Sequence, residues 1–378
     1  MTVPSSTHAP DQKYEVTPLE LFFDLVFVFA MSQLSHHLLE HLSWRGIAET
    51  LVMLLAVFTV WSYTSWEATM NPVDKPRTRR MLLAVMLLGL FMNASVTRAF
   101  TTLGWAFVIP LLLIQLGRTL WTLANSPDSV HRDHFLRVLL WMLATAPLWI
   151  AGAAATPEAR LLWWALAAGI GQIGTWLAHP FPGRWLHSEN IAFQGDHMLE
   201  RCRLFLIIAL GETILTTGAA IATAPMTFMT VVTGTAALVG TVALWSLGFG
   251  RAGRLVLQYV EETRDPVRAS LSVVNTLLVM VAGLIAVAVA NELVIAHPHG
   301  HPSTMLSLLL FGGPILFLLA QSWHYWFVLK LRPRLDLIGS AELLLIGFAT
   351  LTAPPYVALI LVGASLSTLA ILDERMAK

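Results

Sequence analysis

Long apolar runs separated by short polar segments make up almost the whole chain. A run of about 20 apolar residues is long enough to cross the hydrocarbon core of a bilayer as an α-helix. The runs predict about twelve membrane-spanning helices, at residues 18–41, 46–70, 80–100, 104–124, 135–155, 160–179, 199–222, 227–249, 268–295, 304–328, 337–353 and 355–373. The pattern therefore predicts an all-α, polytopic membrane protein.

Composition supports this class and narrows the choice of partners. Hydrophobic residues make up 56% of the chain and charged residues only 12%, whereas soluble domains are about 25% charged. Because the formal net charge is zero, we expect membrane lipids around the protein and no nucleic acid as a partner. Cys202 is the only cysteine, which excludes an internal disulfide. We expect no cofactor and no bound metal, and the oligomeric state stays open.

Basic residues predict the orientation, because cytoplasmic loops carry an excess of Lys and Arg. The termini and the even-numbered connections, with the adjoining helix ends, hold 19 of the 23 Lys and Arg residues, while Arg45, Arg98 and Arg160 lie in odd-numbered connections. This asymmetry predicts that both termini are cytoplasmic. Residues 1–16 and 374–378 then form polar cytoplasmic tails, and the first of them lacks a signal-peptide layout.

Similar short stretches recur in the two halves of the chain. Leu-Phe-Phe at 21–23 is similar to Leu-Phe-Leu at 204–206, and Trp-Ser occurs at both 61–62 and 245–246. These matches predict a 6+6 internal repeat whose halves are parallel and related by an axis along the membrane normal. The alternative is chance matching among Leu- and Phe-rich helices. The repeat divides the chain into a first half at 17–179, a cytoplasmic connecting loop at 180–198 and a second half at 199–373.

Two acids within the predicted spans are the first candidates for chemistry. Glu212 follows Glu200 by about 18 Å along a helix axis, which brings it near the middle of the bilayer. Asp24 lies one helical turn beyond Glu20, on the same face of the first predicted helix. A carboxyl group in hydrocarbon is costly unless it is paired, protonated or beside a polar cavity. Asp24 and Glu212 are therefore candidate proton carriers or acid–base catalysts.

Further polar side chains from several predicted helices fall near the inner leaflet, at a depth similar to that of Asp24. The candidate substrate-binding residues among them are Glu20, Arg118, His197, Glu200, Arg201 and His324. Each also has a structural interpretation. Glu20 is suited to cap its helix, and Arg118 either extends to the interface or pairs with an acid of the first or seventh predicted helix. Glu67 is expected to be a solvated acid at the interface.

An outward-facing segment contains three alternating histidines, His297, His299 and His301. Neither Cys nor a carboxylate lies nearby to complete a zinc site. We interpret it as a flexible loop with at most weak affinity for metals, and whether it binds one stays open.

Four stretches resemble the bacterial low temperature requirement protein A (LtrA) family. They are VTPLELFFDLVFVFAMSQLSHHL (Val16–Leu38), GRTLW (Gly117–Trp121), HMLERCRLFLIIALGETIL (His197–Leu215) and GGPILFLLAQSWHYW (Gly312–Trp326). The resemblance spans essentially the whole chain and implies a multi-pass protein of the bacterial inner membrane. It also implies that the eight candidate residues occupy polar motif positions of the family. It implies no settled activity.

Three classes of function fit these residues. The first is a proton-linked secondary transporter of a small molecule, with Asp24 or Glu212 exchanging a proton. The second is an intramembrane enzyme that uses one of these carboxyls as general acid on a lipid or isoprenoid, in a cyclase- or isomerase-type reaction. In that case Arg118 and Arg201 would hold an anionic head group. The third is a structural or partner-binding membrane subunit, which needs no buried acid.

Overall fold

The computed structural model describes residues 16–71, 73–125, 129–180, 193–250, 263, 265–327 and 329–376. Within these ranges the chain forms twelve α-helices and one short 3-10 helix, with no β-strand. The prediction of an all-α protein is therefore confirmed. Residues 181–192, most of the predicted connecting loop, lie outside the described part of the chain.

The N-terminal helices begin where the sequence offers caps or proline. Thr17 caps the first helix, and Pro18, Pro76 and Pro157 occupy first helical turns, where a missing N–H costs nothing. The elements are α1 (Pro18–Glu40), α2 (Trp44–Met70), α3 (Pro76–Ala94), the 3-10 helix η1 (Val96–Arg98), α4 (Gly104–Asn125), α5 (Ser129–Ala154) and α6 (Pro157–Trp176).

The C-terminal elements are α7 (Gly195–Thr223), α8 (Phe228–Phe249), α10 (Pro266–Ala296), α11 (Thr304–Phe327), α12 (Arg334–Ala349) and α13 (Pro355–Met376). The α7 helix begins four residues earlier than the apolar run that starts at 199, so it includes the polar residues Asp196 and His197. It thereby carries His197 and Arg201 on one helical face, one turn apart.

Nine of the described helices are long and apolar enough to cross a membrane: α1, α2, α4, α5, α7, α8, α10, α11 and α13. The predicted number of helices is thus found, but three fall short of these criteria. The α12 helix has only 16 residues, fewer than a perpendicular span needs. Large apolar side chains such as Phe22, Leu215 and Leu345 are more than half exposed on the outer surface. A surface of this kind suits lipid rather than water.

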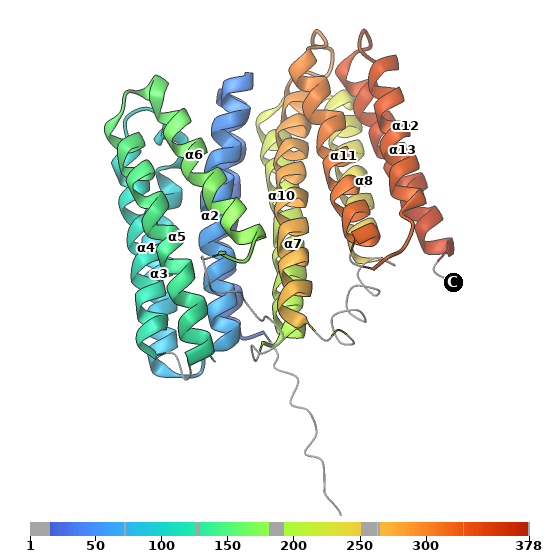
Figure 1. Ribbon diagram of the computed structural model, residues 1–378. Helices are drawn as coiled ribbons and strands as arrows, with labels where there is room; N and C mark the ends of the chain where they lie inside the picture. The colour runs from blue at the N-terminus through green and yellow to red at the C-terminus, as the bar shows by residue number, and fades with distance from the viewer. Residues whose placement is uncertain are drawn as a thin grey trace, which may run out of the picture.

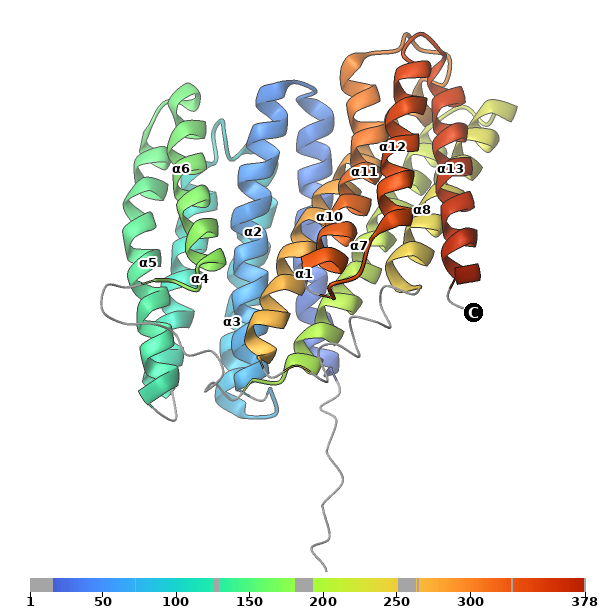
Figure 2. The same ribbon diagram turned by 45° about the vertical axis from the view of Figure 1, so that its right-hand side comes forward.

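The helices stand roughly side by side in two groups. Figure 1 shows α2 to α6 on one side and α7 to α13 on the other, and Figure 2 shows α1, which belongs to the first group, between α2 and α7 and behind α10. At the junction, α1 contacts α7 and α10, and α2 also contacts α7 and α10. Side chains of α1, α2 and α7 therefore meet between the two groups.

The α10 helix is the most buried of the nine candidate spans. It lies against α11 at a close contact of two glycines, because a Cβ on Gly283 would lie 2.6 Å from the carbonyl oxygen of Gly313. A Cβ on Gly313 would likewise lie 2.8 Å from the oxygen of Gly283. Only residues without a side chain allow two helix backbones to approach so closely.

Candidate functional site

A group of buried polar side chains, here called the inner cluster, joins the two groups of helices. It consists of Glu20 and Asp24 of α1, Trp61 of α2, and His197 and Arg201 of α7. Glu20, Asp24, Trp61 and Arg201 are completely buried, and His197 is 6% exposed. Four of the eight sequence-predicted residues therefore meet, and Trp61 joins them.

Asp24 is the centre of the inner cluster. Its Oδ1 accepts hydrogen bonds from Arg201 Nη2 at 2.7 Å and from Trp61 Nε1 at 2.8 Å. The Arg201 guanidinium also lies 5.4 Å from the ring centroid of Phe23. A charged group can be buried only when such partners replace water. The Asp24–Arg201 pair therefore holds α1 and α7 together.

Glu20 has two roles, one for each carboxylate oxygen. Its Oε2 accepts hydrogen bonds from the Thr17 backbone N–H and hydroxyl, both at 2.9 Å, and so completes a capping box. Its Oε1 faces α7, 3.4 Å from His197 Nε2 and 3.6 Å from Arg201 Nη1. Glu20 is thus a helix cap, as one interpretation expected, and a member of the inner cluster.

Several atoms of the inner cluster are buried without a hydrogen-bond partner in the described part of the chain. They are Glu20 Oε1, Asp24 Oδ2, and Nε and Nη1 of Arg201. Unsatisfied buried polar atoms are costly. The remaining acceptor and donor sites can bind water, a proton or a small polar ligand.

A second buried ion pair lies within the first group of helices. Arg118 Nη1 of α4 is 3.4 Å from Glu67 Oε1 of α2, and the Thr122 hydroxyl donates a hydrogen bond to Glu67 Oε2 at 2.8 Å. The Arg118 guanidinium also lies 5.4 Å from the centroid of the Tyr63 ring.

This pair corrects two expectations. Arg118 pairs with an acid of α2 and not with one of the first or seventh predicted helix, because α4 packs against α2, α3 and α5. Glu67 is completely buried and is not a solvated interface acid. Its position near the end of an apolar run did not reveal that α4 covers it.

Glu212 lies farther along the junction of α1 and α7. The Ser32 and His36 side chains of α1 lie near its carboxyl. Glu212 is 8% exposed, and it follows Arg201 by about 17 Å along α7. Glu292 of α10 is also within electrostatic range of His36.

The remaining two candidates lie outside the inner cluster. The half-exposed Glu200 side chain pairs with Arg203 at 3.3 Å. His324 is buried between α10 and α11, where its Nδ1 lies 3.4 Å from the Ser272 hydroxyl. The eight predicted residues therefore do not share one cavity, because Arg118, Glu212 and His324 each have different neighbours.

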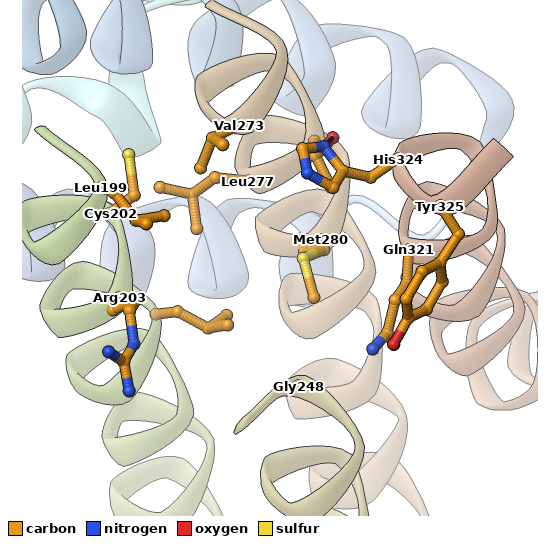
Figure 3. A pocket seen from close by; sticks show the side chains of 12 residues that line it. Leu199, Cys202, Arg203, Gly248, Val273, Leu277, Met280, Gln321, His324 and Tyr325 are labelled. Carbon is orange, nitrogen blue, oxygen red and sulfur yellow. Dashed lines mark hydrogen bonds between the residues drawn. The ribbon is translucent and has the colours of Figure 1, made fainter. Parts of the chain in front are cut away.

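Figure 3 shows the cavity beside His324, which has a volume of about 80 Å³. Residues of α7, α8, α10 and α11 line it, and most of its wall is apolar. Cys202 of α7 forms part of this wall. The cavity adjoins the inner cluster through α7, since Cys202 follows Arg201 directly.

Sequence reasoning missed a third buried group, near the other end of α1. His37 Nε2 lies 3.2 Å from Glu49 Oε2, and Arg45 Nε donates a hydrogen bond to Glu49 Oε1 at 2.7 Å. The spacing of Arg45 and Glu49, one helical turn apart, was the available signal.

The histidine segment shows no metal geometry. Across the described ranges, no three His, Cys, Asp or Glu residues are grouped so that they could hold a metal ion. The ring of His299 packs against Tyr356 with 5.2 Å between the centroids.

Comparison with known proteins identifies the family. A family model described as bacterial low temperature requirement A protein (LtrA) matches residues 15–371. An uncharacterized protein of Rhizobium meliloti (strain 1021) is 31% identical over 350 residues, which cover 90% of this chain and 83% of that protein. No solved structure matches the chain significantly. The resemblance found in the four sequence stretches is thus confirmed, and the chain belongs to the bacterial low temperature requirement A protein (LtrA) family.

Proposed function

We propose that the chain is a proton-linked secondary transporter of a small molecule in the bacterial inner membrane, with both termini in the cytoplasm. The observation that carries this proposal is the buried Asp24–Arg201 pair between α1 and α7, at 2.7 Å. Ionisable groups buried at the junction of two helix bundles are typical of proton and substrate pathways. The excess of Lys and Arg at one face supports the orientation.

Polar groups at two depths of the same helix pair support a proton pathway. We call this pair of facing helix surfaces the α1–α7 seam, with the inner cluster at one end and Ser32, His36 and Glu212 farther along. Asp24 and Ser32 are about 12 Å apart along α1. Between these depths the buried residues of α1 and α7 are apolar, as Phe27 and Phe205 illustrate. Two groups of polar residues separated by apolar residues suit a transport site that opens alternately to either side of the membrane.

The 6+6 repeat belongs to this proposal, and helix packing supports it. In the first half α1 contacts α3, α3 contacts α4, and α2 contacts α6. The corresponding pairs of the second half, α7 with α10, α10 with α11, and α8 with α13, are also in contact. Matching neighbours in two sets of six helices favour a duplicated unit, with α1 and α7 as equivalent first helices. The α1–α7 seam then lies where the two units meet.

In this mechanism, a proton on Asp24 weakens the attraction to Arg201 and allows the two halves to separate at the inner end. Arg201 keeps Glu20 as a second carboxylate nearby, at 3.6 Å, so its charge is not left without a counter-ion. Glu212 accepts or releases a proton at the second polar group, farther along the α1–α7 seam.

The test uses membrane vesicles that contain the full chain and hold an imposed pH gradient. Single compounds from a library of metabolites are added, and a pH-sensitive dye reports proton movement. We expect at least one compound to discharge the gradient with the wild type and not with Glu212→Gln or Asp24→Asn. Glu40→Gln, an exposed acid of the same helix α1, serves as the control and should behave as the wild type.

Proton-coupled flux that persists in Glu212→Gln would remove Glu212 from the mechanism. If no compound moves protons, and if cells with Glu212→Gln or Asp24→Asn behave as cells with the wild type do, the chain is a structural or partner-binding subunit instead.

The apolar cavity beside His324 favours a second candidate, an intramembrane enzyme that acts on a lipid or isoprenoid. Neither Asp24 nor Glu212 lines this cavity, so His324 would act there as the acid–base group. The test compares the lipids of cells that carry the wild type or His324→Gln. An identical lipid composition at all growth temperatures would eliminate this candidate.

A further inference from the structure

The cavity at the inner end of α10 and α11 has the form of a small ligand site. Figure 3 shows His324 projecting from α11 towards α10 and Gln321 projecting towards the side of Gly248 in α8, with Leu277 and Met280 between α11 and α7. Its volume of about 80 Å³ compares with about 150 Å³ for an engineered apolar cavity that binds benzene. The cavity therefore suits a very small molecule or one end of a longer molecule.

The close glycine contact explains why this space exists. Gly283 and Gly313 hold the backbones of α10 and α11 together, and the cavity begins about one turn away along α10, at Met280. Farther towards the inner end, the half-buried Val273 and Thr276 line the cavity. Since these lining residues are partly exposed, the cavity reaches the molecular surface.

Gln321 presents an acceptor that lacks a partner. Its Nε2 donates a hydrogen bond to the Leu247 carbonyl oxygen at 2.8 Å. This bond fixes the amide orientation, because a carbonyl oxygen can only accept. Gln321 Oε1 is buried and has no hydrogen-bond partner among the described residues, so it requires a donor.

His324 presents a second polar atom to the cavity. The Thr276 hydroxyl donates to the Ser272 carbonyl oxygen at 2.9 Å, so its oxygen is left to accept from His324 Nδ1, 3.5 Å away. The Ser272 hydroxyl lies 3.4 Å from the same Nδ1 and can either donate or accept, so Nε2 carries a lone pair or a proton according to the tautomer. His324 Nε2 is buried, and within the described ranges it too lacks a hydrogen-bond partner.

The charge in the cavity wall is already compensated. Arg203 pairs with Glu200 at 3.3 Å, and its guanidinium lies 5.9 Å from the ring centroid of Phe249. Arg203 Nε is buried without a hydrogen-bond partner among the described residues, so the wall offers a donor as well as the Gln321 acceptor. A neutral group that both donates and accepts, such as a hydroxyl, therefore matches this apolar wall better than an anion does.

We propose that this cavity binds the hydroxyl-bearing end of an uncharged, apolar molecule, whose hydroxyl donates to Gln321 Oε1 and has His324 Nε2 as a second hydrogen-bonding partner. A hydroxyl group supplies the missing donor, and the carbon chain contacts Leu277 and Met280. This binding site is separate from the inner cluster and goes beyond the proposed transport, because it requires neither proton movement nor Glu212.

The test is photolabelling of the purified full chain in lipid nanodiscs with an octanol that carries a diazirine. We expect saturable adducts on α7, α10 and α11 at the cavity, and competition by 1-octanol. The matched 1-fluorooctane, which lacks the donor, should compete about tenfold less well, as the loss of one buried hydrogen bond implies.

Val273→Phe fills the cavity and should abolish the saturable adducts, and Thr276→Leu provides a second filled variant if the first does not fold. Ile207→Phe adds the same ring at a side chain of α7 that is 45% exposed, and it should label as the wild type does. Glu212→Gln should also label normally, which separates this proposal from the transport mechanism. Adducts that 1-octanol does not displace, or equal competition by 1-fluorooctane, would overturn the proposal.

Discussion

The contacts of one side chain, Arg201, hold the two helix groups together at their junction. It is completely buried and approaches two carboxylates of α1 at 2.7 Å and 3.6 Å. A buried guanidinium cannot lose its proton to escape the cost of burial. Each of its partners is therefore important for stability as well as for the proposed transport.

Asp24→Asn should lower the free energy of unfolding by about 3–5 kcal/mol, because it leaves Arg201 without its closest counter-ion. Chemical unfolding of the purified protein in detergent measures this change. The control is Asp74→Asn, an exposed acid between α2 and α3, which should change stability by about 0.5 kcal/mol or less.

The double variant Asp24→Asn with Arg201→Gln should be less destabilised than the sum of the two single variants, because no uncompensated charge remains. Strict additivity would show that Asp24 and Arg201 do not interact and would contradict the geometry of the inner cluster.

Part of the inner cluster was predictable from sequence because helical spacing is local. Glu20 and Asp24 are four residues apart, as are His197 and Arg201, so each pair necessarily shares a face. The partners of Arg118 and Glu67 were not predictable, since equal depth in the membrane does not say which helices are neighbours. Trp61 is one of many tryptophans in the sequence, and nothing there distinguished it. Its hydrogen bond to Asp24 forms only because α1 and α2 are neighbours, which the sequence did not show.

Among the connections between helices, Arg160 has an unusual role. Its guanidinium donates hydrogen bonds to five backbone carbonyls, those of Ala99, Thr101, Gly152, Ala153 and Ala155. It thereby joins the connection between α3 and α4 to the C-terminal end of α5. In the sequence, Arg160 was only one of the three basic residues in the connections predicted to lie outside.

Arg160→Lys should destabilise this end of the molecule by about 1–3 kcal/mol, because an ammonium group cannot reach all these carbonyls. Hydrogen exchange of segments 99–103 and 152–156 should become faster. The exposed Arg98→Lys is the matched control, and equal exchange in both variants would refute this role of Arg160.

Gly283→Ala should weaken the packing of α10 on α11, because its Cβ would lie 2.6 Å from the Gly313 carbonyl oxygen. Overpacking of this kind costs about 1–3 kcal/mol. By contrast, Gly169→Ala in α6 meets no atom within 4 Å and should stabilise by about 1 kcal/mol. Thermal unfolding in detergent compares the two, and a stable Gly283→Ala would show that α10 and α11 can separate freely.

At the scale of the whole molecule, apolar runs predicted how many helices form and roughly where each begins and ends. Nine of the twelve described helices meet the length and hydropathy criteria for a membrane span, and α3, α6 and α12 do not, so the predicted number of spans stays a prediction. The arrangement of the helices in two adjoining groups could not be read from the runs, since every apolar face can pack against several others. Weak repeat signals suggested the two halves but not their contact through α1 and α7.

The proposed orientation predicts which loops are accessible from each side. Thr102→Cys and Ser303→Cys replace exposed residues of outer connections, and Asp74→Cys replaces an exposed residue of an inner one. A maleimide that cannot cross membranes should label the first two in intact cells and the third only after permeabilisation. The buried Cys202 should contribute little background, and labelling of Asp74→Cys in intact cells would reverse the orientation.

The divided role of Glu20 also bears on how α1 can move. Its Oε2 closes the first turn through Thr17, while its Oε1 faces His197 and Arg201. Pulling α7 away breaks contacts to one oxygen only, so the first turn does not unravel. The first turn of α1 therefore stays intact when the helix tilts or slides against α7, so a displacement at Glu20 moves α1 as one rigid rod.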